Sequence, residues 1–176
     1  MKDFRNAEMI KILETAKITN RNFSGRVDDY NEKGERKFTL ILEDPELIDI
    51  LIADGWNVKT KETAPDEPIR AYLPVFVDFN NPKYLPKIVQ VTEKNGKQKA
   101  IQLTEDNVGS IDAADIERIT VYVKPKIWYN RATKEPGGIK AMLSKMYFVL
   151  IPDEVEDLYI KNPYNDEDGI ELPFEE

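Results

Sequence analysis

Apolar residues recur at every second position along much of the chain, a period that is typical of half-buried β-strands. Phe23 and Val27 begin such a pattern, and Phe38 and Leu40 resume it after a turn-forming stretch rich in Asp, Asn and Gly. Two alternating runs separated by a turn predict a β-hairpin, here over residues 20–43.

Further strands follow the same pattern. The longest alternation runs over residues 69–79. Next, the dipeptide Asn95-Gly96, a strong hairpin-turn signal, separates apolar stretches at 87–91 and 99–103. The last two predicted strands are 120–128 and 139–151, joined by a flexible basic loop over 129–138.

Helical spacing is confined to short segments. The clearest begins at Asp44, which suits an N-cap, with Pro45 in the first turn, and ends at Gly55. The other two predicted helices are 5–16 and 112–119. The fold class is therefore mainly β with short helices, as in a small barrel or sandwich.

Negative charge is concentrated at one end of the 176-residue chain. The whole chain carries a net charge of −8, and its last 26 residues hold ten acids and one lysine, so residues 1–150 have a net charge of +1. We predict a body over 1–151, with an N-terminal helical extension over 1–17, and a flexible acidic tail over 152–176. Such a tail is an interaction arm or a merely solubilising terminus.

The chain has neither histidine nor cysteine. It therefore lacks the commonest general base, the commonest zinc ligand and any thiol nucleophile. We predict no catalytic residues, no metal and no cofactor. Since no apolar run reaches the length of a membrane span and no export signal is visible, we expect no membrane association and a cytoplasmic location.

The predicted strand over 120–128 has one face with a distinctive chemistry. Val121 and Val123 point toward the core, which places Tyr122, Lys124 and Trp128, together with Lys126, on the opposite face. Lysines neutralise phosphates and aromatic rings stack on bases, so this face suits single-stranded nucleic acid. Alternatively, the rings cover a neighbouring helix while the lysine stems lie along it.

Other cations and rings could extend this surface, although each has a structural alternative. Trp56, at a helix–strand junction, is a second stacking candidate or a core residue, whereas Phe76 is expected in the core with Phe23 and Phe38. The supporting nucleic-acid-binding candidates are Arg21, Arg26, Lys37, Trp56, Arg70, Tyr72, Arg131, Lys134 and Lys140.

The sequence resembles the phage-type single-stranded DNA-binding proteins over about residues 18–150 and the tail. Three stretches carry the resemblance: Arg21-Asn22-Phe23-Ser24-Gly25, the turn from Tyr30 to Phe38, and the segment from Glu43 to Val58. The resemblance implies an OB-fold, an open five-stranded barrel with a basic and aromatic groove, here with helical and hairpin insertions.

The resemblance also implies a role in DNA replication and recombination, and a tail that recruits partner proteins and competes with DNA. The apolar tip Leu172-Pro173-Phe174 matches the end of such tails. In the family the aromatic residue commonly closes the chain, whereas Glu175-Glu176 follow it here. This departure puts docking to a standard host partner in question.

Other functions fit the same residues. The acidic surface could occupy a host protein's nucleic-acid site, as in a phage inhibitor or counter-defence protein. A structural virion protein and a carboxylate-metal nuclease are weaker alternatives. The sequence does not distinguish DNA from RNA as the ligand, because aromatic stacking serves both. It also leaves the oligomeric state open, with a homodimer among the alternatives.

Overall fold

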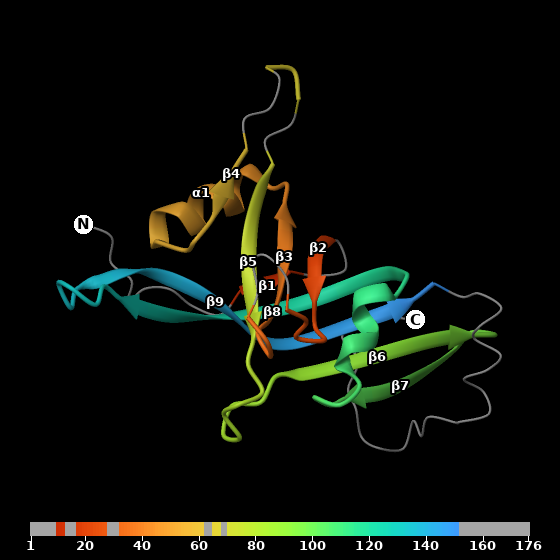
Figure 1. Cartoon of the computed structure of the whole chain (residues 1–176). Helices are drawn as coiled ribbons and strands as arrows, with labels where there is room; N and C mark the ends of the chain where they lie inside the picture. Colours follow the sequence, from red (N-terminus) through yellow and green to blue (C-terminus); the bar gives the residue numbers. More distant parts are fainter. Residues whose placement is uncertain (1–9, 13–16, 28–31, 62–64, 68–69, 152–176) are drawn as a thin grey trace.

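The computed structural model describes residues 10–12, 17–27, 32–61, 65–67 and 70–151 (Figure 1). Within these ranges nine strands form one strongly curled sheet, accompanied by one α-helix and one 3-10 helix. The predicted class, mainly β and OB-fold-like with few helices, is confirmed. The elements are β1 (Ile10–Ile12), β2 (Lys17–Asn22), β3 (Arg36–Leu42), α1 (Pro45–Asp54), β4 (Lys59–Thr60), β5 (Ala71–Val77), β6 (Lys87–Lys94), β7 (Lys97–Leu103), η2 (Val108–Ala113), β8 (Ile116–Tyr129) and β9 (Pro136–Leu150).

Strand β9 links the two halves of the sheet. Strands β2, β3 and β5 form an antiparallel meander, and β5 then pairs in parallel with β9 through Val75 and Phe76. Farther along, β9 pairs in parallel with β6 and antiparallel with β8 over most of its length. The meander stands across the β6–β9 strands, so the sheet curls around a core (Figure 1).

The main core fills the inside of this curl. Alternate residues of β3, β5 and β8 point into it, and Phe23 stacks on Phe38 with ring centroids 5.1 Å apart. Burying such large apolar side chains is the main favourable term in folding. The largest fully buried side chains include Phe23, Phe38, Phe148, Leu40, Leu51, Leu73, Ile88, Ile111, Ile139 and Met146.

Local signals predicted two features accurately. Helix α1 begins after Asp44, whose side chain accepts a hydrogen bond from the Glu46 N–H, and ends at Gly55 with φ of 95°. In the β6–β7 hairpin, Asn95 and Gly96 have φ of 53° and 77°. Two consecutive positive φ angles match the right-handed twist of the flanking strands, which explains the Asn-Gly turn.

Two predicted helices are wrong where the structure describes them. Residues 10–12 of the predicted 5–16 helix form β1, which pairs with β8, and the rest of that helix lies outside the described residues. In place of the predicted 112–119 helix, η2 ends at Ala113 and β8 begins at Ile116. Backbone pairing with a neighbouring strand outweighs a weak local helix preference.

The boundary between body and tail stays a prediction, because residues 152–176 lie outside the described ranges. The described residues contain no helix that is both long and apolar enough to cross a bilayer.

Candidate nucleic-acid interface

A groove of about 530 Å³ opens on the meander of β2, β3 and β5. Cross-strand pairing builds its floor, since Lys37 lies opposite Phe76 and Thr39 lies opposite Pro74. Facing residues of paired strands project from the same side of a sheet, so all four reach the groove. The lining residues are Asn20, Arg21, Asn22, Arg26, Lys37, Thr39, Asn57, Lys59, Pro74 and Phe76.

Phe76 lies in this groove and not in the core, which corrects the sequence prediction. Its neighbours Val75 and Val77 are 0% and 5% exposed, so the alternation of β5 turns Phe76 to the opposite face. The Nζ atoms of Lys140 and Lys37 lie 3.9 and 6.0 Å from the centroid of its ring. The alternation of 69–79 already contained this signal, because a strand with Val75 and Val77 inward must point Phe76 outward.

Lys140 joins the groove to the β8–β9 strands. It lies directly opposite Lys126 in the β8–β9 register, while its ammonium group contacts Phe76 of β5. Burial lowers the pKa of Lys140, and the nearby charge of Lys126 lowers it further. Glu35 and Asp78 oppose this shift in part, and Lys37 adds the smallest lowering effect. The three lysines therefore form a concentrated positive site that favours an anion.

The predicted alternation of β8 between a buried face and an outward face is confirmed. Val121 and Val123 are fully buried, whereas Lys124 is half-buried and Lys126 and Trp128 are exposed. Because Lys126 pairs with Lys140, this stretch continues the basic surface of the groove along the sheet.

Trp128 is held in an open position near the end of the β8–β9 hairpin. A Cβ atom on Gly137 would lie 2.1 Å from its Cζ3 atom, and a Cβ atom on Gly138 would lie 3.0 Å from its Nε1 atom. The indole therefore rests on the bare backbone of two glycines, yet 46% of the residue stays exposed. A ring held in this way costs little ordering entropy when a planar ligand stacks on it.

Tyr122 does not share this open environment. It is half-buried and packs against a second, smaller apolar cluster that contains Val89, Val91 and Tyr147. Its ring meets that of Tyr147 edge-on, with centroids 6.3 Å apart. The structure therefore separates Tyr122 from Trp128, although both lie on the same side of β8.

Trp56 is a core residue, so its prediction as a stacking platform is wrong. It is 4% exposed and belongs to the main core. Hydrogen bonds between Asn57 N–H and the Ile139 carbonyl, and between Ile139 N–H and the Gly55 carbonyl, tie its segment to β9. This pairing, between residues far apart in the sequence, turns the indole inward.

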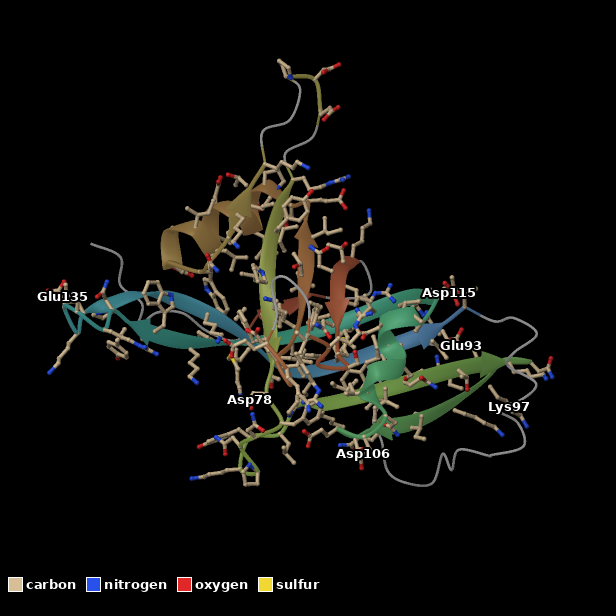
Figure 2. All side chains as sticks on the ribbon, viewed as in Figure 1. Asp78, Glu93, Lys97, Asp106, Asp115 and Glu135 are labelled. Carbon is tan, nitrogen blue, oxygen red and sulfur yellow. The ribbon has the colours of Figure 1, made fainter. Side chains whose placement is uncertain are left out.

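The remaining candidates are spread over the surface. Tyr72 lies opposite Ile41 on the groove side of β5 and is half-buried, whereas Arg70 is exposed just before that strand. Arg131 and Lys134 are exposed in the turn between β8 and β9. Figure 2 shows this tip, marked by Glu135, far from the meander.

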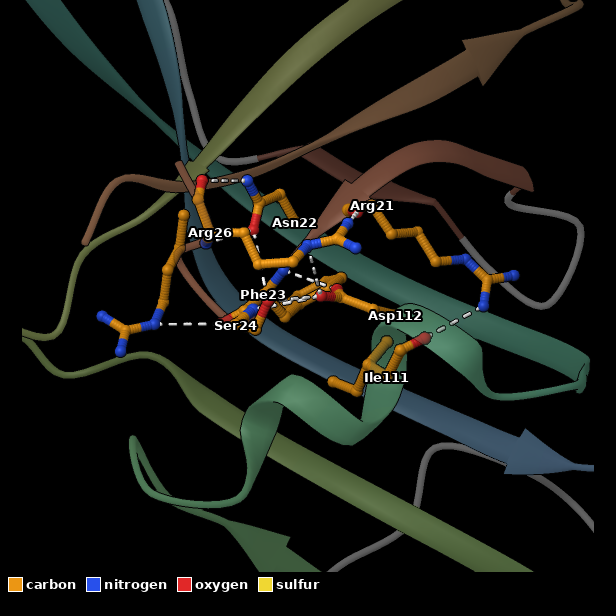
Figure 3. Close-up of polar contacts among 8 residues, drawn as sticks. Arg21, Asn22, Phe23, Ser24, Arg26, Ile111 and Asp112 are labelled. Carbon is orange, nitrogen blue, oxygen red and sulfur yellow. Dashed lines mark hydrogen bonds and ion pairs between the residues drawn. The ribbon is translucent and has the colours of Figure 1, made fainter. Parts of the chain in front are cut away.

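Arg21 has a structural role besides lining the groove. One guanidinium nitrogen donates to the carbonyl of Ile111 at 3.0 Å (Figure 3). The same nitrogen donates to the carbonyl of Ala114 at 2.6 Å, and the two bonds fasten the end of η2 to β2. Because two carbonyls already engage it, we assign Arg21 mainly to the framework of the groove.

Asp112 supports the same corner (Figure 3). Its carboxylate accepts hydrogen bonds from the backbone N–H of Phe23 at 2.6 Å and from Ser24 Oγ at 2.8 Å. The Nε of Arg26 lies 3.9 Å away, and the Arg26 side chain remains 63% exposed. Arg26 is thus anchored loosely and stays accessible to a phosphate.

Sequence reasoning also missed Tyr84 and Lys59. Tyr84 is 56% exposed in the loop between β5 and β6, with the Nζ atoms of Lys124 and Lys83 at 5.1 and 5.6 Å from its ring centroid. No periodicity marks a loop residue, so only the fold brings this ring beside β8. Lys59 stands out only because β4 pairs with β5 at the wall of the groove.

The described residues contain no group of three or more acidic side chains placed to hold a metal ion. What they do contain is a curled β-sheet with a polar groove, a run of cations and partly exposed rings. These features define a nucleic-acid-binding protein of the OB-fold-like class.

Comparison with known proteins identifies the family. Residues 2–176 match a family described as a putative phage ssDNA-binding domain, and the chain belongs to that family. Among solved structures it is similar to gp2.5, a single-stranded DNA-binding protein encoded by bacteriophage T7, with 13% identity, a TM-score of 0.41, and coverage of 94% of this chain and 99% of that chain. No curated protein matches it. The resemblance seen in the sequence is confirmed.

Proposed function

We propose that this phage-type single-stranded DNA-binding protein coats single strands without sequence preference during phage DNA replication and recombination, in the cytoplasm of the bacterial host. The observation that carries the proposal is the continuity of the basic surface. The groove, with Lys37, meets the β8–β9 strands at the Lys126–Lys140 pair, and the exposed Trp128 follows two positions later.

The mechanism is binding without a catalytic step. Each phosphate contact releases counterions, which makes the affinity depend on salt. The cations that make these contacts are Arg26, Lys37, Lys124 and Lys126. Trp128 and Tyr72 stack on bases, and a ring accepts any base because every base has a π-face. Arg70, Arg131 and Lys134 are exposed cations that extend the path outside the groove.

The acidic tail over 152–176 serves two purposes in this proposal. Its ten-acid segment competes with DNA for the basic surface, and its apolar tip, Leu172-Pro173-Phe174, recruits replication or recombination proteins. Deleting residues 152–176 should therefore tighten single-strand binding, most strongly at low salt. Unchanged or weaker binding by the deleted chain would contradict self-competition.

The decisive experiment is fluorescence anisotropy with a labelled 30-nucleotide strand, across salt concentrations, against the matching duplex and the matching RNA. We expect salt-sensitive binding that prefers the single strand to the duplex. No binding by either the full chain or the tail deletion would overturn the proposal and direct attention to a protein target. Sedimentation of the same samples tests for a homodimer.

A further inference from the structure

We propose that Phe76 is a base-stacking platform that Lys140 covers in the free protein and leaves when a single strand binds. The inference rests on the proposed function and deepens it, because it names a nucleobase subsite inside the groove and the group that controls access to it.

The first step is the position of Phe76. Its side chain lines the groove from the middle of the meander, opposite Lys37 and one position away from the buried Val75 and Val77. A large apolar ring in a groove otherwise lined mainly by amides, cations and Thr39 is poorly explained by core packing. It offers a π-face where phosphates would be neutralised beside it.

The second step is the occupation of that ring. The Lys140 Nζ atom lies 3.9 Å from the ring centroid, in cation–π contact. A stacked base would have to take the same space, so the ammonium group and the base exclude each other. Strand β9 holds the Lys140 backbone in place, but the four-carbon side chain can rotate to another position.

The third step is the destination of the ammonium group. Lys126 faces Lys140 from β8 and Lys37 approaches the same ring from β3, while Glu35 and Asp78 are the acids that act on it. In the free protein the pKa of Lys140 is lowered, because burial and the repulsion by Lys126 outweigh the attraction of the two acids. A phosphate brought by the strand relieves this repulsion, so the move from ring to phosphate is favoured only when nucleic acid is present.

A direct test follows the lysine itself by NMR. In ¹³C-lysine-labelled full chain, the Hε protons of Lys140, assigned by their loss in Lys140→Arg, should be shifted upfield by the Phe76 ring current. Saturation with a 30-nucleotide oligo-dT should return them to the ordinary lysine position. If oligo-dT saturates the protein and the shift persists, the inference is wrong while the proposed function stands. If oligo-dT does not bind, both fall.

A second test compares ring variants. Phe76→Leu should lose about 5- to 150-fold in oligo-dT affinity, whereas Phe76→Tyr should keep it. Phe79→Leu is the matched control, since Phe79 also lies beneath a cation, Arg36 at 5.4 Å, but outside the groove lining. Equal losses at Phe76 and Phe79, or no loss at Phe76, would overturn the inference. Circular dichroism melting establishes that each variant is folded.

A third test uses pH. The lowered pKa of free Lys140 is raised when its ammonium meets a phosphate, so binding takes up a proton near the free pKa. Affinity should therefore fall as pH rises through that alkaline range, and Lys140→Arg, which stays charged, should show a flatter profile. Identical profiles for the two proteins would contradict the exchange.

Discussion

The middle and the end of one strand, β8, carry the same kind of residue into opposite environments. Tyr122 near its middle packs with Tyr147 of β9 and Val89 of β6 in the smaller apolar cluster. Trp128 near its end rests on two glycines with 46% of its surface exposed. The same side of a strand is therefore a packing surface where neighbours supply apolar partners and an open surface where they supply lysines and glycines.

The neighbours explain this difference. Opposite the Tyr122 region, β9 turns from the meander toward β6, and a register shift between Tyr122 and Val123 marks the point. Beyond it, Lys124 and Lys126 face Met142 and Lys140. This irregularity in the ladder thus lies between the part of β8 that packs in the smaller apolar cluster and the part that carries the exposed Trp128.

The largest expected effect comes from changing Tyr122 in the packed part of β8. Tyr122→Ala removes a ring from the smaller cluster and should lower the free energy of unfolding by about 2–3 kcal/mol. Its affinity for single strands should stay unchanged. Urea unfolding and anisotropy measure the two quantities. A large loss of affinity at full stability would return Tyr122 to the binding surface.

Trp128→Ala tests the exposed part of β8. In contrast to Tyr122→Ala, it should change affinity and leave stability nearly unchanged. Loss of one stacking ring should reduce affinity by about 5- to 150-fold, with little change in the salt slope because no charge is removed. Stability should change little, since the indole is half-exposed. Trp56, buried at 4%, supplies the internal reference: its emission should not respond to DNA, whereas that of Trp128 should be quenched.

Removing the two lysines that lie between Tyr122 and Trp128 should have a smaller effect on affinity but a clear effect on its salt dependence. Lys124→Ala with Lys126→Ala should weaken binding about fivefold and reduce the salt slope by about 1.4, the value for two lost phosphate contacts on a single strand. The control pair is Lys97→Ala with Lys99→Ala in the β7 strand, which removes the same charge away from the groove. Equal slopes for the two pairs would mean that only net charge matters.

The smallest expected effect concerns Gly137 and Gly138, the two glycines on which the Trp128 ring rests. Gly137→Ala places a methyl group where the indole lies, so the ring must move, and we expect a shift of Trp128 emission to longer wavelength with about a threefold loss of affinity. Gly96→Ala in the β6–β7 turn is the control, because open space surrounds that position and its φ of 77° strains only the turn. An unchanged emission spectrum for Gly137→Ala would show that contact with Gly137 does not hold the Trp128 ring in place.

The sequence predicted the elements that depend on neighbours in the chain. Asp44, Pro45 and Gly55 marked the ends of α1, and Asn95-Gly96 marked the β6–β7 hairpin, because caps and turns are decided by a few adjacent residues. The helix expected over 112–119 failed for the opposite reason. Its residues 116–119 satisfy their backbone groups by pairing with the distant β9 strand.

The residues of the candidate site also fall into two groups, those placed by local pattern and those placed by tertiary contacts. The sequence by itself determined which side of β8 carries Lys124, Lys126 and Trp128, because a strand alternates with a period of two. The same rule, applied to β5 with Val75 and Val77 inward, turns Phe76 away from the core, and the prediction that Phe76 is a core residue was wrong because it did not apply this rule.

Only the tertiary structure decided which of those sides stays open. It buried Trp56 against β9, packed Tyr122 into a cluster and brought Lys140 over Phe76, because exposure depends on what distant segments place opposite a residue. The sequence thus determined which side of β8 each of its side chains occupies, and the curled sheet decided what each of them meets.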